Sequence, residues 1–316
     1  MPAGTTWTRS GLPPLLLLGV LWGVVFPVAR AGVSAGASPL LLVALVLSLA
    51  AAASAPYAWL TRAPRPRARS LAVSAGLGVV LIAGINLPLY WGLQFATGGA
   101  ASIVYAASPV VSLLALAAIG TPDQLHRRQL LALALGLLGV VVLGLAATGG
   151  DLAAGIAAIG AFVLGTSCQG VGAVLVGRER PDGEGPWGLS FQFVGGAAAS
   201  FVVVAVLEPS AQFPIGAATV GSLLYAGLVS MAVGYSLFFG LIHRHGAVRA
   251  NQVTFLNPLV ALLVGAVAFG EGFVPLEAVA LALVVVALVL LQPSRRVPSS
   301  APVGSAPVAP IVREPA

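Results

Sequence analysis

The sequence predicts an all-α membrane protein with ten transmembrane helices, arranged as two inverted five-helix repeats. Three observations support this prediction. Of the 316 residues, 59% are hydrophobic and only 8% are charged, whereas about a quarter of the residues in soluble domains are charged. Apolar segments of roughly 20 residues, long enough to span a bilayer as helices, follow one another from Leu12 to Gln292. Arginines occur in every second connection between these segments, so that nearly all of them fall on one side of the predicted membrane.

The predicted spans fall into two groups of five, separated by a polar break at 148–151. Residues 92–114 align with residues 240–263, allowing a one-residue gap. An odd number of spans per repeat places the second copy in the opposite orientation. The expected organisation is a cytoplasmic N-terminus at 1–12, a first repeat at 13–147, a second repeat at 153–292 and a disordered cytoplasmic tail at 293–316. The ten expected spans are 13–30, 38–61, 70–93, 100–120, 127–147, 153–177, 187–207, 216–242, 249–270 and 274–292.

The distribution of charge predicts the orientation of the chain in the membrane. All fifteen basic residues are arginine, and the formal net charge is +6. If the N-terminus is cytoplasmic, every arginine except Arg30 falls on the cytoplasmic side, as the positive-inside rule requires. The basic charge is therefore explained by topology, and no nucleic-acid partner is expected. Cys168 is the only cysteine, which excludes a disulfide or a thiolate metal cluster within one chain.

Two prolines interrupt apolar spans at matching places in the two halves. Pro109 lies in the stretch 101–120, and Pro258 lies in the stretch 246–272. Proline within a helix removes a backbone hydrogen bond that lipid cannot replace. Matched interruptions in two repeats indicate a binding site between them. The sequence therefore predicts a central, water-accessible cavity; the alternative is that the prolines are packing kinks and the nearby amides form hydrogen bonds between helices.

Polar side chains cluster around these interruptions. Asn86, Tyr90 and Gln94 are spaced i, i+4, i+8 in the third span, and this stripe must face protein or a cavity because lipid would not solvate it. The aromatic residues of the first and eighth spans can be cavity walls or ordinary core residues. The expected cavity residues are Trp22, Asn86, Tyr90, Gln94, Tyr105, Pro109, Gln169, Tyr235, Asn251, Thr254, Asn257 and Pro258.

Two charged residues are expected at the outer ends of spans. Glu271 closes the ninth span and is either a hydrated interfacial carboxylate or a gate and proton-binding residue. Arg30 can pair with Glu271, attract an anionic substrate or extend to the membrane interface. No acidic residue lies deep within any predicted span. Protons are therefore a candidate coupling ion without an obvious carrier through the membrane centre.

Motifs of membrane enzymes and pumps are absent from the sequence. The three histidines fall in predicted cytoplasmic loops, and the chain has no metalloprotease, nucleophile-elbow or P-loop motif. We expect no enzymatic activity, no cofactor and no metal. A small-molecule metabolite and the lipid bilayer are the expected partners, and a homodimer is an open alternative. A passive channel and a membrane partner protein that does not transport anything are the competing functions.

Several of these residues together resemble a known family. They are Leu21-Trp22-Gly23 in the first span, the Ser-Pro and Asn-Pro pairs of spans four and nine, and PLVALLVGAVAFGEG at 258–272. In combination they resemble the EamA-type transporters of the drug/metabolite transporter superfamily, over about 12–147 and 154–292. The resemblance implies ten helices, cytoplasmic termini, alternating access and efflux of amino acids or related compounds from the bacterial cytoplasm across the inner membrane. The first repeat departs from the family in reading Gly120-Thr121-Pro122 where a Gly-Glu pair is expected, so a paired role for two glutamates is not implied.

Overall fold

The structure is a computed structural model that describes residues 12–106, 127–147, 151–179, 185–245, 253, 256–272 and 275–291. Within these ranges every regular element is helical, as the sequence predicts. The elements of the N-terminal half are α1 (Leu12–Ser34), α2 (Pro39–Leu60), α3 (Ala68–Gly78), η1 (Val79–Ala83), α4 (Gly84–Gly92), α5 (Gly98–Ala106) and α7 (Arg127–Ala147). Those of the C-terminal half are α8 (Leu152–Glu179), α9 (Pro186–Leu207), α10 (Ala217–Leu224), η2 (Tyr225–Gly234), α11 (Tyr235–His245), α13 (Asn257–Phe269) and α14 (Pro275–Leu291).

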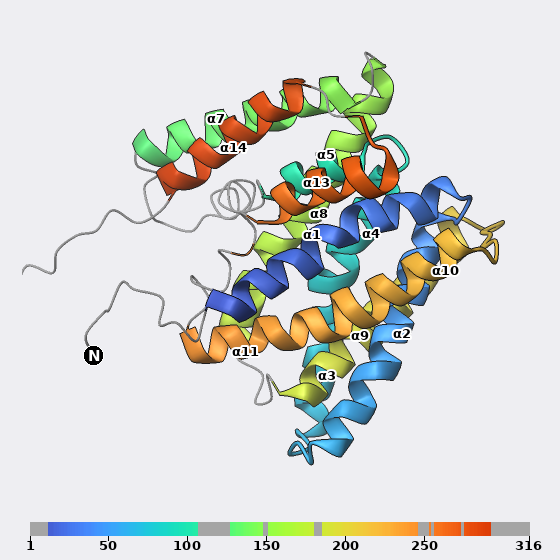
Figure 1. Ribbon diagram of the computed structural model, residues 1–316. Coiled ribbons are helices and arrows are strands. Elements are labelled where there is room, and N and C mark those ends of the chain that lie inside the picture. The colour runs from blue at the N-terminus through green and yellow to red at the C-terminus, as the bar shows by residue number, and fades with distance from the viewer. Residues whose placement is uncertain are drawn as a thin grey trace, which may run out of the picture.

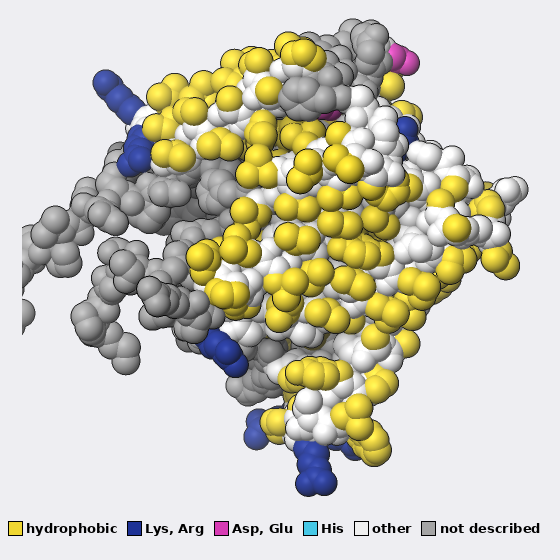
Figure 2. Space-filling view, viewed as in Figure 1, with side chains coloured by type: hydrophobic (Ala, Val, Ile, Leu, Met, Phe, Trp, Pro, Cys, Tyr) yellow, Lys and Arg dark blue, Asp and Glu magenta, His cyan; other side chains and the backbone are white. Residues whose placement is uncertain are grey.

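The chain is a multi-pass membrane protein. Five helical segments among the described residues are long and apolar enough to cross a membrane, and four further helices contain shorter apolar stretches. Large apolar side chains remain exposed on the outside of the bundle; Val267 on α13, for example, is 79% exposed. Figure 2 shows such side chains across the middle of one face, with most of the visible arginines at its lower and left edges. This distribution suits a surface that is solvated by lipid rather than by water.

Helices from the two halves pack against each other throughout the bundle. α2 packs along α9, α4 packs on α8, and α1 packs on both α10 and α13. α5 contacts α13 and α8, while α7 and α14 lie side by side along one edge of the molecule (Figure 1). The centre of the bundle is therefore formed by α1, α4, α5, η2 and α13, which come from both halves of the chain.

Two helices change from α to π geometry near the centre of the bundle. η1 continues α3 into α4, and η2 continues α10 into α11. In η1, for example, the Gly84 N–H donates to the carbonyl oxygen of Val79, five residues earlier. A π-turn displaces backbone carbonyls from the regular i→i+4 pattern, which is why such turns are common at functional sites. The two π-helices occupy the third and the eighth of the expected spans.

In the described part of the ninth span, the proline stands at the start of a helix. α13 begins at Asn257, and Pro258 stands in its first turn. Proline is tolerated there because the first N–H groups of a helix have no intrahelical partner. The helix ends at Gly270, whose φ of 64° is left-handed, and the chain then turns back so that the Glu271 N–H donates to Gly265 O over 2.9 Å. The start of α13 thus lies inside the bundle as a helix N-terminus.

Candidate functional site

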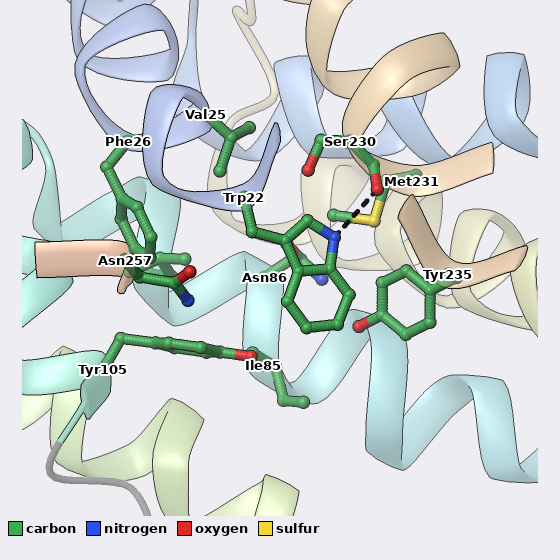
Figure 3. A pocket seen from close by; sticks show the side chains of 11 residues that line it. Trp22, Val25, Phe26, Ile85, Asn86, Tyr105, Ser230, Met231, Tyr235 and Asn257 are labelled. Atoms are coloured by element: carbon green, nitrogen blue, oxygen red, sulfur yellow. Dashed lines mark hydrogen bonds between the residues drawn. The ribbon is translucent and has the colours of Figure 1, made fainter. Parts of the chain in front are cut away.

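A small cavity lies where α1, α4, α5, η2, α11 and α13 meet (Figure 3). The volume open to the centre of a water-sized sphere is about 40 Å³. A single water needs about 10–15 Å³ by the same measure, so the cavity has room for a few waters. None of the described side chains that line it is charged. They are Trp22, Val25, Phe26, Ile85, Asn86, Leu89, Tyr105, Ser230, Met231, Tyr235 and Asn257.

Trp22 connects α1 to the π-helix η2. Its indole Nε1–H donates to the carbonyl oxygen of Ser230 over 3.0 Å, as the dashed line in Figure 3 shows. Its ring centroid lies 5.3 Å from that of Tyr235 and 5.1 Å from that of Phe238. Gly234 has no side chain to displace this indole: a Cβ there would come within 2.4 Å of Trp22 Nε1. The indole is therefore fixed by a hydrogen bond at one edge and by aromatic packing at its sides.

Asn86 makes an equivalent contact with the other π-helix. Its side chain is 4% exposed, and Nδ2 donates to the carbonyl oxygen of Ile82 in η1 over 2.8 Å. In both π-helices, a carbonyl oxygen therefore accepts a hydrogen bond from a side chain that lines the cavity. A carbonyl in this position needs such a partner because an unpaired backbone group in a membrane interior costs several kcal/mol.

Asn257 is the polar residue whose position is hardest to explain by packing alone. It is the first residue of α13, it is completely buried, and neither Oδ1 nor Nδ2 has a hydrogen-bond partner within the described part of the chain. The face beside it is closed by α1, where Gly19 and Gly23 pack tightly against Leu256 and Val260. A buried, unpaired amide costs about 1–3 kcal/mol, so a ligand or water that satisfies it would stabilise the site.

Other expected cavity residues occupy different positions. The Tyr105 ring packs 5.6 Å from Phe26 and lines the cavity. Tyr90 is buried in the neighbouring core, and its Oη has no partner among the described residues. Gln94 is exposed, and its Nε2 donates to Trp91 O over 3.1 Å. Pro258 stands beside Asn257 in the first turn of α13. Gln169 belongs to α8, but its side chain lies outside the described residues, as do Pro109, Asn251 and Thr254.

The sequence did not identify the apolar part of the cavity wall. Val25, Phe26, Ile85, Leu89 and Met231 line it, but in the sequence they are indistinguishable from lipid-facing or core residues. Helical spacing from the predicted polar residues is the only signal that could have found them. Phe26 follows Trp22 by four residues, and Leu89 follows Asn86 by three, so each pair shares a helix face.

We call the part of the bundle that carries Glu208, Glu271 and Glu277 the carboxylate end. Glu271 Oε1 accepts from the Gly98 N–H over 3.0 Å, and Oε2 accepts from the Gly99 N–H over 3.4 Å. The Glu271 carboxylate thereby caps the N-terminus of α5, where a negative charge is favoured. Thr97 Oγ1 donates to Glu277 Oε1 over 3.4 Å and accepts from the Ala100 N–H over 3.1 Å.

Two further contacts tie helices together at the carboxylate end. The Glu208 carboxylate, which follows α9, accepts from the Leu40 and Leu41 N–H groups at the start of α2, over 3.4 and 3.2 Å. Arg30 on α1 donates from Nη1 to the carbonyl oxygen of Leu93, at the end of α4. In this structure Arg30 thus binds a helix C-terminus, where a cation is favoured, while Glu271 binds a helix N-terminus.

An all-helical bundle with several membrane-crossing helices around an uncharged, buried cavity has the architecture of a membrane transport protein. Comparison with known proteins identifies the family. The sequence profile of the EamA-like transporter family matches the chain twice, over residues 9–145 and over residues 156–292. The chain therefore belongs to the EamA-like transporter family.

Individual relatives agree with this assignment. The chain is 23% identical over 302 residues to "Uncharacterized transporter YvbV" of Bacillus subtilis, covering 94% of this chain and 96% of that protein. It is 26% identical over 277 residues to "Probable amino-acid metabolite efflux pump" of Salmonella typhimurium, covering 81% and 86% of the two chains. A protein of known crystal structure has the same fold, with a TM-score of 0.59 and 22% identity over 90% of this chain and 97% of that one.

Proposed function

We propose that the protein is a secondary transporter that exports amino acids or related small metabolites across the bacterial inner membrane by alternating access. The observation that supports this proposal most directly is the central cavity. It is buried and uncharged, and α1, α4 and α5 of the first half line it together with η2, α11 and α13 of the second. A site between two halves becomes accessible from alternate sides when the halves rock against each other.

The proposal includes ten spans arranged as two inverted repeats, with both termini in the cytoplasm. Three features support the repeat. The family profile matches each half once, π-helices interrupt the third and the eighth spans, and the pairings between halves are reciprocal. α4 packs on α8 as α10 packs on α1, and α5 contacts α8 as α13 contacts α1. The arginine distribution supports the orientation and places the carboxylate end on the periplasmic side.

The substrate class follows from the absence of charge in the cavity lining. A solute with a net charge would leave that charge uncompensated in a low-dielectric site, whereas a net-neutral metabolite would not. The name of the Salmonella relative also refers to amino-acid metabolites. In this conformation the cavity has room for a few waters, so its aromatic side chains must move apart to admit any but the smallest amino acids.

Glu271 is our candidate for the periplasmic gate. Its carboxylate joins the end of α13 to the start of α5 across the two halves, and this contact must change if the halves separate there. Because no acidic side chain lines the cavity, this carboxylate is also the candidate binding group if protons are the coupling ion. A homodimer is compatible with this mechanism, which does not require one.

Transport by purified protein in liposomes tests the proposed function. Wild-type protein should drive a labelled neutral amino acid against its gradient, whereas a passive channel would only equilibrate it and a non-transporting partner protein would give no flux. Asn86→Leu and Asn257→Leu should each reduce transport at least tenfold while the protein inserts normally, since each loses a polar cavity group. Gln94→Leu, an exposed amide, is the matched control. Normal flux in both cavity variants would place the site elsewhere.

A further inference from the structure

The start of α13 combines two features that favour the same kind of ligand group. The first N–H groups of a helix have no intrahelical partners and carry a partial positive charge. In α13 fewer of these N–H groups are free, because Pro258 has none and the Val260 N–H is bonded to Leu256 O over 3.1 Å. The partial positive charge of the helix N-terminus is therefore the feature that favours a ligand here. Helix N-termini of this kind bind carboxylates and phosphates, and broken transmembrane helices use them for anionic groups of substrates.

The second feature is the side chain of Asn257. It is completely buried, and neither Nδ2 nor Oδ1 has a hydrogen-bond partner among the described residues. In Figure 3 the amide lies on the cavity side of α13, between the rings of Phe26 and Tyr105. Nδ2 can therefore donate to a negatively charged oxygen that also lies against the helix N-terminus, while Oδ1 can accept from an N–H donor of the same ligand.

The rest of the cavity restricts what else the ligand can carry. Among the described residues no arginine lines the cavity, so an anion without its own positive charge would be poorly compensated there. Trp22, Phe26, Tyr105 and Tyr235 instead present aromatic rings, whose faces attract ammonium groups. The remaining wall is apolar and contains Val25, Leu89 and Met231. A zwitterion with a small apolar side chain satisfies all three parts of the wall.

We propose that Asn257 and the N-terminus of α13 bind the carboxylate of a zwitterionic amino acid. The ammonium group of this substrate faces the aromatic rings, and its side chain contacts the apolar wall. This inference builds on the proposed transport function, because it assigns the substrate orientation within the same cavity. It makes Asn257 the residue that distinguishes an amino acid from an amine of the same size and shape.

Binding and flux of matched acids and amides test the inference. The probes are glycine, L-alanine, L-valine and L-methionine, each with its carboxamide, which keeps the ammonium group and loses the carboxylate. Calorimetric titration of the purified protein should show at least one acid binding about tenfold or more tightly than its amide, as expected for a hydrogen bond to a charged group. Proteoliposome flux of the same probes is measured in parallel.

Two substitutions of Asn257 separate its role from a general packing defect. Asn257→Leu retains most of the side-chain volume, and it should weaken acid binding about tenfold while amide binding changes less than about twofold. Asn257→Asp should invert the preference, because a second carboxylate repels the acid and attracts the ammonium group of the amide. Aspartate is favoured in the first turn of a helix, so this variant should fold. Gln94→Leu should change neither affinity.

The outcomes distinguish the inference from the proposed transport function. If no probe shows flux but acids bind more tightly and Asn257→Asp inverts the preference, the transport function is wrong and the inference stands. If flux occurs but wild-type protein binds acids and amides equally, the inference is overturned. Equal weakening of acid and amide by both Asn257 variants also overturns it, as does the absence of binding by all eight probes.

Discussion

The carboxylate end and the central cavity satisfy their polar groups in opposite ways. At the carboxylate end, Glu271 accepts two backbone N–H groups of α5, and Glu208 accepts two of α2. Arg30 there donates to the last turn of α4. In the cavity, by contrast, the amide of Asn257 is completely buried and has no partner among the described residues. The charged groups at the carboxylate end are bonded within the protein, whereas the cavity contains at least one polar group that is free to bind a ligand.

This difference gives the two regions different roles: the carboxylate end holds the helices together, and the cavity binds the ligand. The bonds of Glu208 and Glu271 join helices of different halves and use fixed backbone groups, so they stabilise one arrangement of the helices whatever solute is present. The Asn257 amide forms no hydrogen bond that stabilises that arrangement, and a ligand would satisfy it. If this division is correct, substitutions at the carboxylate end should alter stability or opening, whereas substitutions in the cavity should alter affinity.

The largest effect should come from filling the close contact between α5 and α1. A Cβ on Gly98 would lie 2.5 Å from Pro27 N and 2.8 Å from Phe26 C, both backbone atoms that cannot rotate away. Gly98→Ala should therefore destabilise the protein by about 3 kcal/mol, the upper end of the usual range for overpacking, and displace the N–H groups that Glu271 binds. Thermal unfolding in detergent measures this. Gly240→Ala, where no atom lies within 4 Å, should leave Tm unchanged or slightly raise it.

A smaller effect is expected from neutralising the carboxylates one at a time. Glu271→Gln keeps one acceptor oxygen but loses the charge that favours the α5 N-terminus, which should cost about 1–2 kcal/mol. Glu208→Gln is the matched control, since it removes the same kind of contact from α2. Both should lower Tm, but only Glu271→Gln should change the transport rate if Glu271 is the gate. If the two variants transport at the same rate, Glu271 is a structural helix cap and not a gate.

The smallest effect should come from the indole N–H in the cavity. Trp22→Phe keeps an aromatic ring near Tyr235 but leaves Ser230 O without its donor, at a cost of about 1 kcal/mol. The KM for the transported amino acid should rise several-fold with little change in Tm. A fall in Tm as large as that of Glu271→Gln would show that the Trp22 contact stabilises the bundle, and the proposed division between the two regions would then fail.

The sequence predicted the helical class and the five segments that are long enough to cross a membrane in the structure, because these depend on hydropathy. It also selected Trp22, Asn86, Tyr105, Tyr235 and Asn257, which the structure brings together around one cavity. Such residues can be recognised because a polar or amphipathic side chain within an apolar span has to face protein or a cavity.

Three features could not be read from the sequence. Gln94 fits the helical stripe of Asn86 and Tyr90, but it falls beyond Gly92, where α4 ends, and is exposed. Arg30 binds a backbone carbonyl, and backbone partners leave no trace in side-chain patterns. The helix start at Asn257 could not be distinguished from a kink, because Pro258 is compatible with both.

The π-helix η2 determines how the cavity can be studied by mutation. Its residues, YAGLVSMAVG, are as apolar as an ordinary membrane helix, and the polar group that Trp22 binds is the backbone carbonyl of Ser230. Side-chain scanning leaves that oxygen in place, so Ser230→Ala would appear silent even if the carbonyl is essential. Replacing the amide bond after Ser230 with an ester, which weakens the carbonyl as an acceptor, addresses it directly. Part of the polarity of this cavity therefore comes from backbone geometry, which amino-acid substitutions alter only indirectly.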